Sequence, residues 1–154
     1  MAAAPEWQVA GWLNGPGPAS LAALRGRVVL ALAFQMLCPG CAAHAVPQAL
    51  RVRAAFPEED VVVLGLHTVF EHHAGQGSEA SLAAFLHEYR VDFPVARDLP
   101  DAAGMPCTMG AYAMRGTPTL LAYDRAGQLR LHQFGHVDDI ALGALLGRLA
   151  AAPA

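Results

Sequence analysis

The sequence predicts an α/β fold in which a mixed central sheet is flanked by helices, and three observations lead to it. Residues 28–34 and 61–66 form two continuous apolar runs, each opening with β-branched side chains, as is typical of strands buried on both faces. A helical stretch over about 38–56 separates these runs, which favours a parallel pair joined by a right-handed crossover. Residues 119–123 and 129–134 flank an Asp-Arg-Ala-Gly turn, which predicts a late antiparallel hairpin.

The other elements follow from shorter signals. A Gly/Pro loop precedes a helical turn that Ser20 can cap, and Pro47 should kink the helix that follows the first apolar strand. Ser78 or Ser81 caps a later helix whose apolar side chains fall on one stripe. In chain order these elements are the turn 20–24, a loop 68–77 rich in His and Gly, helix 78–89, strand 93–96, helix 108–114 and helix 140–149.

Length and composition indicate one globular domain. The 154 residues fit a single domain with a core over about 24–150 and an N-terminal extension over 1–23. Hydrophobic residues make up 55% of the chain and charged residues 15%, which is enough apolar material for a packed core. The net charge is −3 and Lys and Arg form no block, so we expect no nucleic-acid or membrane partner.

The apolar runs are shorter than the ~20 residues that a membrane helix needs. The start of the chain lacks the basic and apolar regions of a signal peptide. We therefore expect a cytoplasmic protein, or a periplasmic one if an export signal was trimmed.

Three cysteines carry the strongest chemical signal. Cys38 and Cys41 form a Cys-x-x-Cys motif that follows a buried strand and opens a helix. Free N–H groups and the positive end of the helix dipole favour a thiolate at Cys38, which is the attacking form in disulfide exchange. Cys41, one turn further on, should be more buried and resolve a mixed disulfide. Half of a zinc site can have the same spacing.

A second signal lies directly before the predicted strand 119–123. Gly116, Thr117 and Pro118 stand there, and a proline at a strand start cannot donate a ladder hydrogen bond. A cis bond between Thr117 and Pro118 would make a tight turn with an exposed backbone edge. Taken alone, this motif also fits an ordinary trans-proline loop.

The two signals together resemble the thioredoxin superfamily, and most closely its TlpA/ResA-like redoxin branch of thiol-disulfide oxidoreductases. The resemblance spans about 24–136 and includes an extra strand–helix insert near 78–96. It implies that a cis-proline at Pro118 lies against the cysteines and that Thr117, with Gly116, pairs with the backbone of a substrate peptide. Pro39 and Gly40 would flank the site, and no cofactor is implied.

Three positions depart from the family pattern. Leu32 replaces a buried Asp, Leu37 replaces a Trp, and His44 stands where ResA-like members have a Glu. Residues three apart share a helix face, so His44 could reach Cys41 and accept its proton. A half-buried or surface histidine without a role is the alternative.

Two further features have open roles. His67, Glu71, His72 and His73 cluster after the second buried strand, at the sheet edge where Cys38 is expected, so the loop could flank the site and hold Glu71 near Cys41. An ordinary solvated loop is the alternative. Cys107 is either a third redox group or an inert thiol.

Four other functions are alternatives to disulfide exchange with a protein or small-thiol partner. A Cys3His zinc cage would need a second close pair of ligands. A peroxidase would need Pro and Thr where Ala31 and Gln35 stand, and haem attachment would need His at Ala42. A redox-silent binding module would retain the fold and the partner surface, and a Cys38→Ser change would leave its function intact. The direction of exchange is not fixed, although a reductant suits a reducing cytosol.

Overall fold

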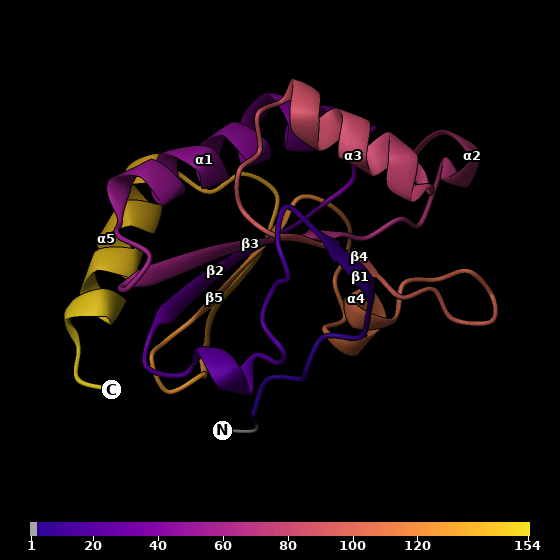
Figure 1. Cartoon of the computed structure of the whole chain (residues 1–154). Helices are drawn as coiled ribbons and strands as arrows, with labels where there is room; N and C mark the ends of the chain where they lie inside the picture. The colour runs from indigo at the N-terminus through magenta and orange to yellow at the C-terminus, as the bar shows by residue number, and fades with distance from the viewer. Residues whose placement is uncertain (1–2) are drawn as a thin grey trace.

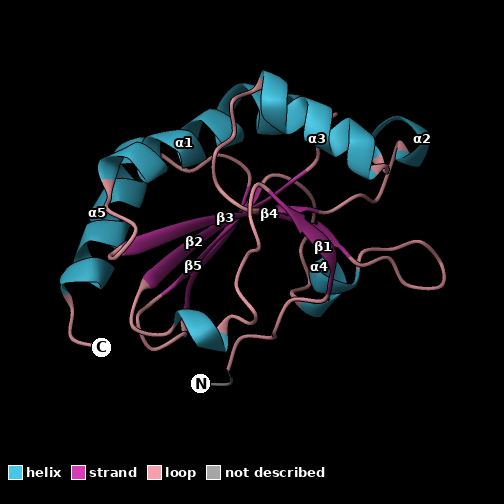
Figure 2. Cartoon of the chain, viewed as in Figure 1, coloured by secondary structure: helices cyan, strands magenta, loops and turns pink. Residues whose placement is uncertain are grey.

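A six-stranded mixed sheet lies at the centre of the computed structural model, which describes residues 3–154 (Figures 1 and 2). Its strand order is β1-β4-β3-β2-β5-β6, with β2, β3 and β4 parallel and the other neighbours antiparallel. The strands are β1 (Val9–Leu13), β2 (Val28–Phe34), β3 (Val61–His67), β4 (Val95–Asp98), β5 (Thr119–Tyr123) and β6 (Leu129–Phe134). The predicted α/β fold class with a mixed sheet is confirmed.

Helices cover both faces of this sheet. Figure 1 shows α1, α3 and α5 along one side and α4 on the other. Their bounds, with the short helical segments, are η1 (Ala22–Leu24), η2 (Cys41–Ala45), α1 (Val46–Ala55), α2 (His73–Gln76), α3 (Glu79–Glu88), α4 (Cys107–Ala111) and α5 (Asp139–Ala151).

Strand β2 is covered on both faces, which explains why its sequence is continuously apolar. Its even-numbered side chains pack in the cluster beneath α1, α3 and α5, and its odd-numbered side chains pack in the cluster on the α4 side. All seven residues of β2 are buried. The residues that follow Phe34 therefore start from a strand that is packed on both faces.

Two predicted elements begin at different residues for local reasons. The strand predicted at 93–96 is β4 at Val95–Asp98, because Pro94 has no N–H to donate to a ladder. The helix predicted at 108–114 is α4 at Cys107–Ala111. Its early start follows from the buried Asp98 carboxylate, which accepts the backbone N–H groups of Thr108 and Met109.

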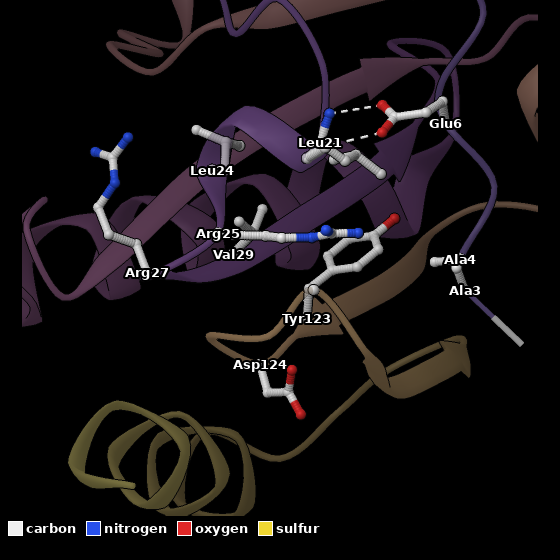
Figure 3. Close-up of a pocket in the computed structure, with 12 residues that line it drawn as sticks. Ala3, Ala4, Glu6, Leu21, Leu24, Arg25, Arg27, Val29, Tyr123 and Asp124 are labelled. Atoms are coloured by element: carbon white, nitrogen blue, oxygen red, sulfur yellow. Dashed lines mark hydrogen bonds between the residues drawn. The ribbon is translucent and has the colours of Figure 1, made fainter. Parts of the chain in front are cut away.

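The N-terminal segment contributes an edge strand that the sequence patterns did not indicate. β1 pairs antiparallel with β4. The chain before it is anchored by Glu6, whose carboxylate accepts the backbone N–H groups of Leu21 and Ala22 at 2.6 and 3.1 Å (Figure 3). A small cavity of about 30 Å³ lies beside these groups and beside Tyr123, at the end of β5 opposite to Thr119. Residues 1–23 thus include part of the sheet.

Candidate functional site

Three strand ends bring the predicted site residues together. Phe34 at the end of β2 lies opposite His67 at the end of β3, and Ala33 lies opposite Thr119 at the start of β5. The cysteine loop after β2, the His/Gly loop after β3 and the proline before β5 therefore meet at one edge of the sheet. Parallel and antiparallel pairing together place them there.

The two cysteine sulfurs lie in different surroundings. Cys38 is half-buried and its Sγ accepts the backbone N–H of Cys41 at 3.3 Å, as an N-cap side chain does. The Cys38 thiol also lies 3.6 Å from the carbonyl oxygen of Thr117. Cys41 is fully buried, and both thiols are free.

Burial, and after it the hydrogen bond with Cys38, raise the pKa of the Cys41 thiol to about 12. Contacts with the Gln35 backbone and with Thr117 act in the opposite direction but are smaller. Cys41 is thus held protonated at neutral pH while the neighbouring sulfur is accessible.

The helix that carries the cysteines begins at Pro39 and widens into a π-turn over Cys41–Ala45. Val46 donates its N–H to the Cys41 carbonyl, five residues back, just before Pro47, which has no N–H. The predicted irregularity at Pro47 thus takes the form of a wide turn.

This wide turn determines where His44 lies. Positions 41 and 45 face the core, whereas His44 is exposed and its ring centroid is 6.3 Å from that of His136. A π-turn holds more residues than an α-turn, so the three-residue spacing no longer stacks His44 over Cys41. Proton transfer between these two residues stays a prediction.

The residues before β5 lie against the cysteines. The Thr117–Pro118 peptide bond is cis. Gly116 is packed so closely that a Cβ there would lie 3.0 Å from the Phe134 ring, which accounts for glycine at this position. Gly40 lies between the two cysteines in the chain, and a Cβ atom on it would be 3.8 Å from the ring of Pro118.

A hollow of about 230 Å³ adjoins Pro118 and Gly40. Ala45 and Leu120 give it apolar walls, and His44 and His136 also line it. Its size suits one side chain rather than a larger small-molecule ligand, for which pockets of roughly 300–1,000 Å³ are typical.

Only His67 of the predicted His/Glu cluster is buried. Its Nε2 accepts the backbone N–H of Met36 at 3.1 Å, two residues before Cys38. Burial lowers the pKa of His67 to about 4, helped by the charge of Arg97, so the ring is neutral and able to accept. The side chains of Glu71, His72 and His73 are exposed.

Sequence reasoning missed two buried glutamines beside the cysteines. In the sequence, Gln35 stands out only as a departure from the peroxidase pattern, and Gln76 lies in the loop after β3. Each is 1% exposed, and the two side chains are joined by a hydrogen bond of 2.9 Å. A polar residue at the end of an otherwise apolar strand was the available signal for Gln35.

Cys107 is the first residue of α4, and its backbone N–H donates to the Leu99 carbonyl oxygen. Within residues 3–154, no group of three or more His, Cys, Asp or Glu side chains is arranged to hold a metal ion. In the same part of the chain, no helix has both the length and the apolar character required to cross a membrane.

Solved structures similar to this chain share its architecture. A crystallised thioredoxin-like superfamily protein is 55% identical over 100% of this chain and 99% of its own, with a TM-score of 0.95. A thiol-disulfide isomerase from Corynebacterium glutamicum is 44% identical over 97% and 98%, with a TM-score of 0.92. The thioredoxin domain of a thiol-disulfide oxidoreductase from Bacteroides vulgatus, 18% identical over 96% of both chains, matches in fold with a TM-score of 0.74. No protein-family model and no curated protein sequence matches the chain.

Proposed function

Because the chain belongs to the thioredoxin-like superfamily and is an oxidoreductase of the thiol-disulfide class, we propose that it exchanges disulfides with a protein or small-thiol partner through Cys38 and Cys41. One observation carries the proposal. An accessible sulfur at a helix start accepts the N–H of Cys41, whose own thiol is buried. This arrangement favours attack by the first sulfur and resolution by the second.

The reaction begins when the Cys38 thiolate attacks one sulfur of the partner disulfide. The other partner sulfur leaves as a thiolate and takes up a proton, and a mixed disulfide joins Cys38 to the partner. Cys41 then loses its proton and attacks the Cys38 sulfur, which releases the second partner thiol. Two electrons pass to the partner and a Cys38–Cys41 disulfide remains; the reverse reaction uses the same residues.

The high pKa of Cys41 would prevent it from reacting early. Part of that elevation comes from Cys38, through a hydrogen bond and charge repulsion. A Cys38 sulfur in a mixed disulfide carries no charge, so the repulsion vanishes and the pKa of Cys41 falls at the moment when resolution is required. We retain His44 as the proposed proton acceptor for this step.

The partner chain would lie along Gly116 and Thr117, with its reacting sulfur near Cys38. The hollow beside Pro118 would receive an apolar side chain that flanks the partner's cysteine. We also propose the TlpA/ResA-like branch as the chain's place in the superfamily, on the basis of the α3–β4 insert between β3 and β5. In a reducing cytoplasm the protein would act as a reductant.

Trapping tests the proposal. In a Cys107→Ser background, Cys41→Ser should accumulate a mixed disulfide with a disulfide-bonded peptide, visible as an added mass on Cys38. The matched Cys38→Ser variant should accumulate none, because Cys41 is buried and protonated. Equal trapping by both variants would show that the assignment of the attacking and the resolving cysteine is wrong, and trapping by neither would remove disulfide exchange as the function.

A further inference from the structure

Two buried glutamines tie together the three segments that surround Cys38. We propose that Gln35 and Gln76 are positioning residues that hold Thr117 and the residue before Cys38 in register for a peptide partner. This inference rests on the proposed function, since it concerns how a partner strand would align with the reacting sulfur.

Gln35 is the first residue after β2 and links two of the segments. Its Nε2 donates to Thr117 Oγ1 at 3.2 Å, across the site. Its Oε1 accepts the backbone N–H of Phe70 at 3.2 Å, in the loop after β3. One side-chain amide therefore connects the end of β2 with the proline turn and with the following loop.

Gln76 completes the connection from the other side. Its Nε2 donates to Gln35 Oε1 at 2.9 Å and to the Glu71 carbonyl at 2.8 Å. Its Oε1 accepts the backbone N–H of Leu37 at 3.0 Å, one residue before Cys38. The short helix α2, which ends with Gln76, is thereby fixed beside the cysteine loop.

The hydrogen bonds of the two glutamines reach Thr117 and Leu37, which both adjoin Cys38 in the site. A buried amide costs free energy unless its polar atoms are bonded, and apolar side chains could fill the same volume without that cost. Here the bonds end on Thr117, whose carbonyl oxygen lies 3.6 Å from the Cys38 sulfur, and on Leu37. Both residues determine where a partner backbone would lie relative to the sulfur.

Two kinds of disulfide should depend differently on this alignment. A peptide disulfide must pair its backbone with Thr117 while its sulfur meets Cys38. A small aromatic disulfide needs access to the sulfur alone. Loss of the glutamine network should therefore slow the peptide reaction selectively.

The experiment compares two second-order rate constants for reduced full-length protein, measured by stopped flow. The probes are a disulfide-bonded peptide and dithionitrobenzoate. Gln35→Leu and Gln76→Leu should each slow the peptide reaction by about tenfold and change the dithionitrobenzoate reaction by less than about threefold. The two variants probe opposite ends of the network, so either one alone suffices if the other does not fold.

Tyr112→Phe is the matched control. It removes the hydrogen bond that Tyr112 donates to the Pro5 carbonyl and the one that it accepts from the Tyr123 hydroxyl, at the end of β5 opposite to the cysteines. Its ratio of the two rate constants should equal that of the wild type. A glutamine variant with a wild-type ratio, or a control that lowers the ratio equally, would overturn the positioning role while leaving the proposed function intact. Failure of the wild type to react with either probe would overturn both.

Discussion

Acidification should destabilise this protein through a single buried histidine. His67 lies at the end of β3 with 4% of its surface exposed, and its Nε2 accepts the N–H of Met36. Burial lowers its pKa from 6.5 to about 4 in the folded chain. A protonated ring could not accept this hydrogen bond. Protonation of His67 therefore destabilises the folded cysteine loop.

The size of the effect follows from the two pKa values. Between about pH 6.5 and pH 4 the unfolded chain binds this proton more tightly than the folded chain, so stability falls as pH falls. The stability that neutral His67 contributes is fully present above about pH 6.5, the pKa of the histidine in the unfolded chain, and is lost progressively below it. At about 1.4 kcal/mol per pKa unit, a change from pH 7 to pH 4.5 should remove about 2 kcal/mol from the free energy of unfolding.

Urea denaturation at these two pH values measures the effect. His67→Gln offers Met36 an oxygen acceptor but does not titrate, so its loss of stability should be smaller than the wild type's by about 2 kcal/mol. His87→Gln, at an exposed position on α3, should behave as the wild type. All other titrating groups are shared, so an equal loss in wild type and His67→Gln would refute the assignment of the proton to His67.

Two further predictions concern the thiols. A short pulse of iodoacetamide at pH 8 should alkylate Cys38 and leave Cys41 unlabelled. Cys41 is buried, and with a pKa of about 12 it is a thiolate in roughly one molecule in ten thousand. Peptide mass spectrometry identifies the labelled cysteines, and labelling of Cys41 before Cys38 would contradict this order. If His44 accepts the Cys41 proton, His44→Asn should slow release of a peptide from its mixed disulfide by about a hundredfold. His87→Asn, at an exposed position on α3, is the control, and an unchanged release rate in His44→Asn would remove His44 from the mechanism.

The sequence predicted the elements whose signals are local. β2, β5 and β6 have the predicted bounds, because a doubly covered strand and a tight hairpin mark their own ends in the chain. The placement of Cys38 and Cys41 at a helix start was visible for the same reason. β1 was not visible, because its five residues are only partly buried and gain their partner, β4, from far along the chain.

The supporting residues could not be predicted because their partners are distant. Gln35 and Gln76 are separated by 41 positions, and neither belongs to a motif. The orientation of His44 depended on a π-turn, which helical spacing does not reveal. Patterns along the chain thus predicted the cysteine pair as the site but not the groups that hold it in place.

Those supporting groups also satisfy the backbone hydrogen bonds of the segment that leads to Cys38. Buried backbone groups are costly when unpaired, so the segment leading to Cys38 needs a partner for each of them. Thr68 donates its backbone N–H to the Phe34 carbonyl, and Met36 donates its own to His67 Nε2. The backbone N–H of Leu37 is donated to Gln76 Oε1, and that of Cys38 to the Gln35 carbonyl. Three of the four partners come from β3 or the loop after it. The position of the Cys38 sulfur is therefore determined by the neighbouring strand as much as by its own helix, and variants in the β3 loop should alter exchange without touching either cysteine.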